Sequence, residues 1–316
     1  MNSLFSTVAA INSAAPASAP LAIKSVSHLA GVAMLAAVSI SKWSAGKVDK
    51  RVTREVADAH NTDASAGRYN KRLIAKDALD KIATVESEAR KDHHARTLPW
   101  SDDGPRILSA AGFADWSARM REHKAKFESA VADFVQNYPA LIDDARVRLN
   151  GLFNEADYPP ASDIARKFRF EIRVENMPDS SDFRVALGDS QVAAIRADMD
   201  ARAQEAFSAA TRDVWQRIAD RVGHMAEKLR SYKPAGAAGD RSQGTFHASL
   251  VENVRELVAL LPALNIANDP ALDAVAKRMA KELCAEDATA LRASAMARET
   301  VAASAESILA NVREYL

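Results

Sequence analysis

The chain has 316 residues, 48% hydrophobic and 27% charged, a balance typical of a globular protein with a sizeable core. Lysine plus arginine equal aspartate plus glutamate at 42 each, which excludes bulk electrostatic attraction to nucleic acid or membrane. A single cysteine, Cys284, excludes an internal disulfide framework and favours a reducing cytoplasm. Any binding to a polyanion must therefore come from a local patch.

The first 32 residues are rich in Ala and Ser and are predicted to form a disordered leader, outside the folded domains. No lysine or arginine precedes Lys24, so the positive region of a signal peptide is missing. The apolar stretch 26–40 is shorter than the roughly 20 residues that cross a bilayer, so we expect no membrane association. The pattern of Val38, Ile40 and then Trp43 predicts a short strand at this point of the chain.

The segment after this strand is predicted to be helical. Valines recur every four residues from Val48, which predicts a short helix capped by Asp49 and ending near His60. A polar loop over 61–67 and a helix from about Tyr69 to Ala95 follow in this interpretation.

An aromatic stripe gives the strongest helical signal in the chain. Its members are Phe113, Trp116, Met120, Phe127, Val131, Phe134 and Tyr138. Their spacing places them on one face over about seven turns, as in a core-facing helix or a coiled-coil seam. Pro139 is expected to bend or restart the helix, whose pattern continues to Phe153.

Residues 168–175 alternate apolar and charged side chains without exception, which predicts a strand. A second short run around Phe183 and Val185 follows a polar, turn-like stretch, so we expect a β-hairpin over 168–187. The strand at Val38 is a candidate third member of this sheet. The apolar face of the hairpin should be core, and its charged face should form cross-strand ion pairs or meet a protein partner.

The second half of the chain is predicted to be helical. A long helix capped by Ser190 runs to Tyr232, and the Gly- and Pro-rich segment 233–245 forms a linker. The remaining residues, 246–316, are expected to form a C-terminal subdomain of three helices, the last from Asp287 to Leu316.

The predicted fold class is therefore mainly α with a small antiparallel β-sheet (α+β). A long helical hairpin with the β-hairpin at one end makes up a domain over 33–232, and the helical subdomain completes the chain.

No motif for catalysis is evident in the sequence. Neither a phosphate-binding glycine loop nor a serine nucleophile elbow is present. His93 and His94 are adjacent on a predicted helix, where their side chains point about 100° apart, so we expect an exposed helix end and no metal site. We predict no catalytic residue, cofactor, metal or small-molecule substrate, although a site assembled from distant residues would leave no linear motif.

Basic residues concentrate between Lys42 and Lys76, where nine stand against four acidic residues, a local net charge of +5. Trp43 and Tyr69 are interleaved with them, a composition suited to a groove that follows phosphates and stacks bases. The alternative is a solvated basic face, balanced by acidic neighbours in the fold. With the arginines of the hairpin, the candidate nucleic-acid or partner-binding residues are Lys42, Trp43, Lys47, Lys50, Arg51, Arg54, Arg68, Tyr69, Lys71, Arg72, Arg169, Arg173 and Arg184.

Several short motifs follow one another in an order that resembles an uncharacterised phage and prophage family of unknown function. They are Lys42-Trp43-Ser44 to Val48-Asp49-Lys50, Gly67-Arg68-Tyr69-Asn70-Lys71, Thr97-Leu98-Pro99-Trp100 with Asp102 and Gly104, Asp157-Tyr158-Pro159, Asp182-Phe183-Arg184-Val185, Leu261-Pro262-Ala263-Leu264-Asn265 and Asp269-Pro270. The resemblance covers roughly residues 38–285. It implies phage origin and genes nearby for a MoxR-like AAA ATPase and a von Willebrand A-domain protein, and it supplies no catalytic residues.

Two hypotheses of function follow. The first is a non-enzymatic phage protein in the host cytoplasm that acts by protein–protein assembly or as an oligomer, with a AAA-type ATPase as one partner. The second is a single-stranded nucleic-acid binding or annealing protein that uses the basic segment 42–76. The nucleic-acid hypothesis is favoured over the assembly hypothesis if four basic residues converge beside the hairpin: Lys50, Arg51, Arg68 and Arg72.

Overall fold

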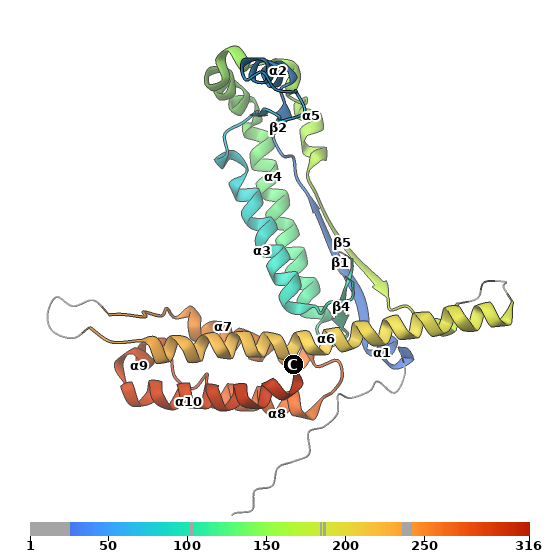
Figure 1. Ribbon diagram of the computed structural model, residues 1–316, viewed down its shortest axis with the longest axis vertical. Coiled ribbons are helices and arrows are strands. Elements are labelled where there is room, and N and C mark those ends of the chain that lie inside the picture. Colours follow the sequence, from blue (N-terminus) through green and yellow to red (C-terminus); the bar gives the residue numbers. More distant parts are fainter. Residues whose placement is uncertain (1–25, 102–103, 184, 186–187, 236–241) are drawn as a thin grey trace, which may run out of the picture. The chain divides into compact units, whose positions relative to one another are not determined.

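The computed structural model describes residues 26–101, 104–183, 185, 188–235 and 242–316, and it is mainly helical with small antiparallel sheets (Figure 1). This confirms the predicted fold class. The described chain forms two compact units: the first holds 26–213 with 262–266, and the second holds 214–261 with 267–316. The division falls within helix α6 (Asp189–Ser231), whereas the sequence placed it at 233–245.

A three-stranded antiparallel sheet lies at the centre of the first unit. Strand β1 (Ala33–Ser41) is its middle strand, between β4 (Arg106–Ser109) and β5 (Arg169–Asn176). In the β1–β5 register, Ile40 faces Phe170 and Val38 faces Ile172. The strand predicted from alternation is therefore confirmed, and so is its pairing with the segment around Val38.

The predicted β-hairpin over 168–187 is not formed by the described residues, and most of its expected second strand lies outside them. Within the described chain, strand β5 pairs with β1 alone, and the polar stretch after β5 closes on itself in a 3₁₀ turn, Ser180–Asp182. The Asp179 carboxylate accepts the Ser181 N–H, and the Phe183 N–H donates to Ser180 O, so local hydrogen bonds replace those of a second strand. Val185 belongs to no strand, while 184 and 186–187 lie outside the described residues.

Helices α3 (Asp80–Arg96) and α4 (Phe113–Leu149) pack side by side next to β1 and β5 (Figure 1). The predicted aromatic stripe, apart from the exposed Phe113, supplies the core: Phe127 packs edge-on against Phe170 and Phe134 against Phe168. Helix α4 continues through Pro139. The helix predicted from Tyr69 begins only at Asp80, because the chain before it forms a strand.

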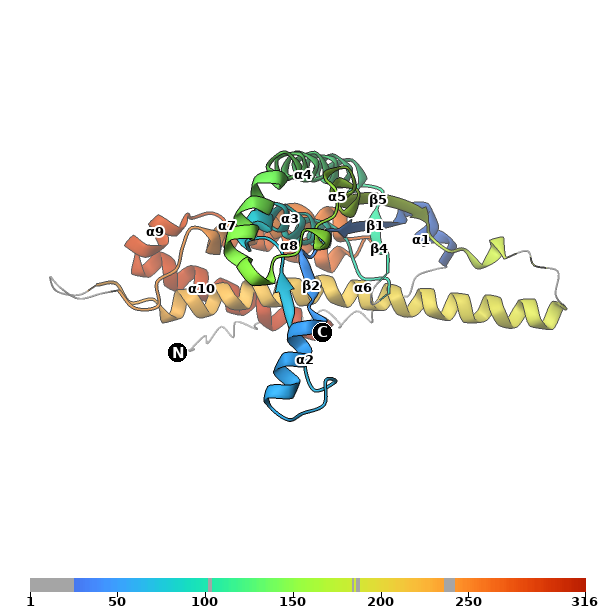
Figure 2. The same cartoon turned by 90° about the horizontal axis from the view of Figure 1, so that it is seen from above.

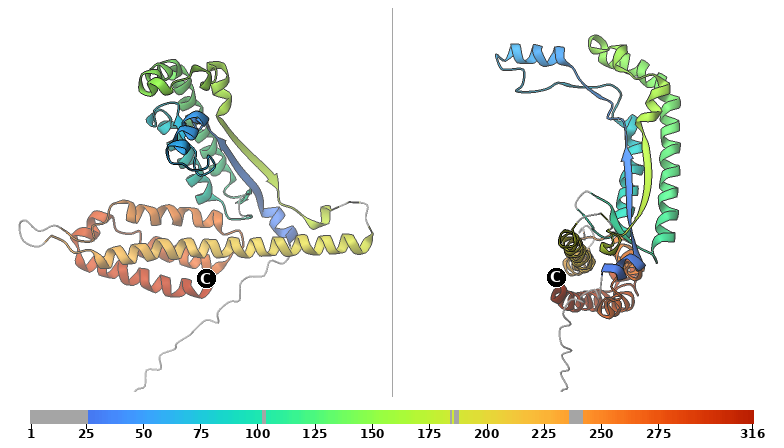
Figure 3. Two further views of the ribbon diagram at one scale, coloured as in Figure 1. Left: turned by 45° about the horizontal axis from the view of Figure 1, so that its top comes forward. Right: turned by 90° about the vertical axis from the view of Figure 1, so that its right-hand side faces the viewer.

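That strand belongs to a small lobe, which we define as residues 46–72. Within it, β2 (Gly46–Val48) pairs with β3 (Asn70–Arg72), and α2 (Lys50–Ala59) lies between the two strands in the sequence. The Asp49 side chain accepts two backbone N–H groups at the start of α2, and His60 caps its end, as predicted. Figures 2 and 3 show α2 and the chain beside it projecting from one end of the α3–α4 pair.

The ends of the first unit carry short helices. Helix α1 (Val26–Val32) precedes β1, so the predicted disorder of residues 1–32 is wrong for these residues, and 1–25 lie outside the described part. Helix α5 (Ala161–Ile164) precedes β5. Short 3₁₀ turns occur at Asp77–Leu79, Asn150–Leu152, Glu155–Asp157 and Ala165–Lys167.

The second unit combines the C-terminal half of α6 with α7 (Ser249–Leu264), α8 (Pro270–Glu282), α9 (Ala288–Ala293) and α10 (Ala295–Val312), followed by a 3₁₀ turn, Arg313–Tyr315. Asp269 caps α8 at Pro270, as predicted. The single helix predicted from Asp287 is wrong. Ser294 interrupts it, because its hydroxyl accepts the Ala297 N–H and starts α10.

Two further predictions concern the second half of the chain. Ser190 lies inside α6 and does not cap it. The ends of the Gly- and Pro-rich segment are paired, since Lys233 and Gln243 exchange both backbone hydrogen bonds, while 236–241 lie outside the described residues. No helix in the described part of the chain combines the length and apolarity needed to cross a bilayer.

Candidate functional site

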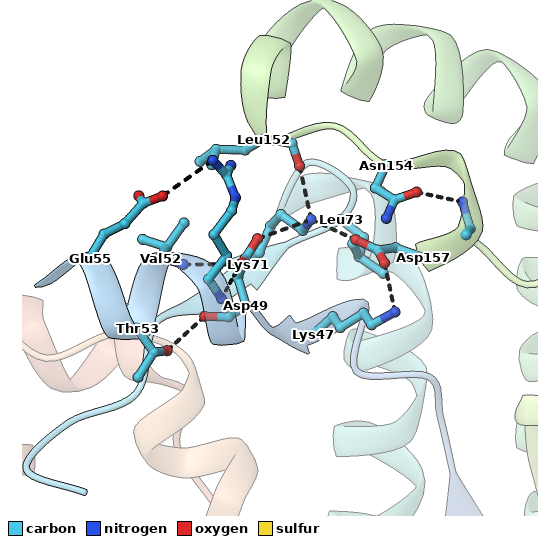
Figure 4. Close-up of polar contacts among 12 residues, drawn as sticks. Lys47, Asp49, Val52, Thr53, Glu55, Lys71, Leu73, Leu152, Asn154 and Asp157 are labelled. Carbon is cyan, nitrogen blue, oxygen red and sulfur yellow. Dashed lines mark hydrogen bonds and ion pairs between the residues drawn. The ribbon is translucent and has the colours of Figure 1, made fainter. Parts of the chain in front are cut away.

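The lobe is fixed at its base by a buried lysine, Lys71, whose side chain is only 4% exposed. Its Nζ lies 2.5 Å from Asp157 Oδ2 and 3.4 Å from Asp49 Oδ2 (Figure 4). It also donates a 2.8 Å hydrogen bond to the Leu152 carbonyl. The other Asp157 oxygen, Oδ1, lies 2.6 Å from Lys47 Nζ. Four charged side chains from the lobe and the 155–157 turn thus form one ion cluster.

The charges of this cluster stabilise one another. Burial lowers the pKa of Lys71, but its contacts with Asp157 and Asp49 outweigh this and leave the pKa above its ordinary value. Burial raises the pKa of Asp157, but its contacts with Lys47 and Lys71 outweigh burial and leave the pKa below its ordinary value. A general base needs a pKa near neutrality, so these groups act as a structural clamp.

Backbone acceptors strengthen the clamp. Arg148, on α4, donates through Nη2 to the carbonyls of Arg72 and Leu73, at 3.1 Å each. The Tyr158 hydroxyl donates a 2.7 Å hydrogen bond to the same Leu73 carbonyl. The end of β3 is therefore bound to α4 and to the turn before α5, which gives the lobe a defined position within the first unit.

We expect acid to release the lobe. The pKa of Asp157 is lowered in the folded state. The pKa of Asp49 is lowered as well, and the hydrogen bond from the Val52 backbone N–H is the largest cause. A lowered carboxyl pKa stabilises the folded state at pH values above the ordinary aspartate pKa of about 4. This stabilisation is lost as the pH falls through the pKa of the folded state. Hydrogen exchange within β2 and β3, corrected for intrinsic rates, should therefore accelerate below about pH 4. Protection that is unchanged down to about pH 2 would contradict this expectation.

Several predicted binding residues are engaged in the fold. Trp43 is 9% exposed and packs edge-on against Tyr138 with ring centroids 5.8 Å apart, so its face is closed to a base. Lys42 pairs with Glu86 at 2.6 Å, and Arg51 pairs with Glu55 at 3.2 Å. Within the described residues, the basic side chains of this segment without an ion pair are Lys50, Arg54, Arg68, Arg72 and Lys76.

The basic residues do not gather beside β5. Lys50 and Arg51 lie on α2, Arg68 follows in the connection, and Arg72 ends β3; no hydrogen bond or ion pair in the described chain joins them to β5. On β5 itself, Arg169 and Arg173 pair with Glu171 of the same strand, and their neighbours on β1 carry no charge. The expected cross-strand ion pairs are therefore replaced by pairs along one strand. Arg184 lies outside the described residues.

The lobe also exposes large apolar side chains, which the sequence did not point out as a site. Val48 is 41% exposed, Val56 50% and Tyr69 39%. Val56 and Tyr69 line a cavity of about 350 Å³ between α2 and the connection 62–69. The sequence does carry a signal for this surface, the narrow valine stripe on the otherwise polar helix α2. The lobe is too small to bury every valine of that stripe, so some of them stay exposed.

Comparisons with known proteins leave the chain without an assigned relative, since no protein-family model, curated protein or solved structure matches it. In the described residues, no group of three or more His, Cys, Asp or Glu side chains could hold a metal ion. The candidate site that the structure offers is the surface of the lobe, with its exposed apolar side chains and its cations that have no ion pair within the described residues.

Proposed function

We propose that the chain is a non-enzymatic phage protein that acts by protein–protein assembly in the host cytoplasm, with the lobe as its docking surface. The observation that carries this proposal is the group of exposed apolar side chains, Val48, Val56 and Tyr69, on a lobe anchored through Lys71. The resemblance of the short motifs implies phage origin, and the single cysteine favours the cytoplasm as the place of action.

Anchoring the lobe favours binding. A surface that is ordered before the encounter loses less conformational entropy on association than a mobile loop does. Burial of one large apolar side chain stabilises a complex by up to about 1.5–3 kcal/mol. The half-exposed Val56, with Tyr69 at the same cavity, therefore provides a compact apolar anchor point.

The charges of the lobe indicate the chemistry of the partner. Lys50, Arg54, Arg68 and Arg72 are exposed and carry no ion pair within the described residues. Such a surface complements an acidic segment that offers an apolar side chain to the cavity. The resemblance makes a AAA-type ATPase the first partner to test.

We expect the Val56→Glu variant to lose this partner, because the substitution adds a negative charge to the apolar anchor point. Val147→Glu is a matched control: Val147 is a helical valine on α4, 83% exposed and outside the lobe and its apolar cavity. With the purified ATPase as prey, calorimetry should show binding weakened at least about tenfold by Val56→Glu and unchanged by Val147→Glu. Equal effects of the two variants would contradict the proposal.

The second candidate is binding of single-stranded nucleic acid, favoured by the unpaired cations of the lobe and by the exposed Tyr69 ring. A gel shift with labelled single strands tests it. A shift at low salt that disappears when Lys50, Arg54, Arg68 and Arg72 are replaced by Ala would support this candidate. If no shift is seen at low salt, assembly remains as the proposal.

A further inference from the structure

Strand β5 has one edge without a partner strand within the described chain. It is an outer strand of the sheet, and its eight residues pair with β1 in one continuous register without a bulge. It contains neither proline nor glycine. An outer strand of this length presents a row of unpaired backbone N–H and carbonyl groups, which is a template for a further strand. We call this side of the strand the open edge of β5.

Hydrogen bonds on the other side of the sheet show which residues face the open edge. Ile107 of β4 exchanges both backbone hydrogen bonds with Leu98, so it turns these groups away from Leu35, its neighbour on β1. In such an antiparallel pair both residues point outward, so Leu35 directs its backbone groups to Glu175 of β5. The direction alternates along a strand, so the open edge presents the backbone groups of Phe170, Ile172, Val174 and Asn176.

The described residues that follow β5 do not cover this edge. The Phe183 carbonyl accepts a 3.1 Å hydrogen bond from Arg196 Nη2 of α6, and Val185 belongs to no strand. Figure 1 shows this stretch leading from the end of β5 to the start of α6. No backbone hydrogen bond within the described chain reaches the open edge. A strand from another molecule can therefore pair with it.

The charges of β5 are complementary to a second copy of the same strand. When two copies run antiparallel with Ile172 opposite Ile172, Arg169 lies opposite Glu175. Glu171 then lies opposite Arg173, and each of these pairs occurs twice by symmetry. Opposite charges at facing positions stabilise neighbouring strands, and like charges destabilise them. A shift of the register by two residues in either direction sets arginine opposite arginine and glutamate opposite glutamate, so the pattern selects a single register.

The ion pairs that β5 now makes do not oppose this exchange. Glu171 lies 3.4 Å from Arg169 and 4.0 Å from Arg173, and all three side chains are at least 42% exposed. Exposed pairs of this kind contribute little to stability. One carboxylate serves two guanidinium groups in the single chain. Pairing of two copies adds the exposed Glu175, so that each guanidinium group faces a carboxylate of its own.

We propose that the open edge of β5 binds β5 of a second copy of this chain, antiparallel and centred on Ile172, so that the two sheets join into one. The same register sets Val174, which is 45% exposed, opposite the Phe170 of the second copy. Aromatic and β-branched side chains at facing positions add to the stability of a strand pair. The open edge is separate from the lobe, so this proposal and the proposed function can fail independently.

The oligomeric state of the full chain tests the proposal by analytical ultracentrifugation. We expect a dimer that dissociates on dilution, and a strict monomer at about 100 μM would overturn the proposal. Two variants that keep the net charge test the register. Arg173→Glu with Glu175→Arg sets like charges opposite each other and should weaken association at least about tenfold. Exchange of all four charges, by adding Arg169→Glu and Glu171→Arg, restores opposite pairs and should keep the affinity within about threefold. Equal affinities of the two variants would overturn the register.

Amide exchange of the wild-type chain gives a second test, which needs no substitution. At residue resolution, the amides of Phe170, Ile172 and Val174 should gain protection as the concentration rises through the dissociation constant. The amides of Glu171 and Arg173 already face β1 and should change less. Outward amides that stay unprotected in the dimer would overturn the assignment to this edge.

Discussion

Replacing Lys71 by Met is expected to free the lobe from the rest of the first unit. The Asp157 carboxylate is 5% exposed and would lose the cation that lies 2.5 Å away, while Asp49 would face it without a counter-charge. Breaking a buried ion pair by removing one partner costs about 3–5 kcal/mol, and the second lysine at Asp157 places this change near the lower limit. Amide exchange in β2 and β3 should therefore accelerate about 100-fold, measured by mass spectrometry.

Lys47→Gln is the matched control for this change. Lys47 also contacts Asp157, at 2.6 Å, but its side chain is 50% exposed. Exposed ion pairs contribute about 0–1 kcal/mol, so exchange in the lobe should accelerate less than about fivefold. If Lys71→Met leaves exchange unchanged, or if both variants accelerate it equally, the Lys71 cluster does not anchor the lobe.

The second large effect is expected for Trp43→Ala, which should lower the free energy of unfolding by about 3–5 kcal/mol. The indole is buried and packs against Phe134 and Tyr138, so truncation leaves a cavity in the core of the first unit. Urea denaturation followed by circular dichroism measures the loss.

Tyr69→Ala is the comparison for Trp43→Ala, because the sequence proposed both aromatic residues as base-stacking groups. Tyr69 is 39% exposed, so its truncation should change the free energy of unfolding by only about 0.5 kcal/mol. A Trp43→Ala variant that keeps wild-type stability would contradict the assignment of Trp43 to the core.

Local periodicity explains which parts of the fold could be predicted. Helix α2, the aromatic stripe of α4 and strand β5 each carry their pattern within a few turns or residues, and the structure confirms them. The sequence also offered the strand around Val38 as a member of the sheet, but it predicted a second strand directly after β5, because the polar stretch there resembles a hairpin turn. Its hydrogen bonds instead close a 3₁₀ turn, and β1, far away in sequence, supplies the pairing.

The candidate site shows a different limit of sequence reasoning. A count of charges between Lys42 and Lys76 cannot reveal that Lys71 is neutralised by Asp157, which folds back from a distant turn. Nor can it show that Trp43 is buried beneath α4 while Tyr69 remains exposed. Periodicity likewise gave no sign that His93, one of two adjacent histidines, turns inward to Trp116. Each outcome depends on contacts between segments far apart in the chain.

The central claim is that the apolar surface of the lobe meets a partner protein. Photo-cross-linking tests it most directly, with benzoylphenylalanine placed at position 56 and, as the control, at position 147 in cells that produce the full chain. We predict one discrete cross-linked partner from position 56, lost when Lys50, Arg54, Arg68 and Arg72 are also replaced by Ala, and none from position 147. The same products from both positions, or none from position 56, would contradict the claim.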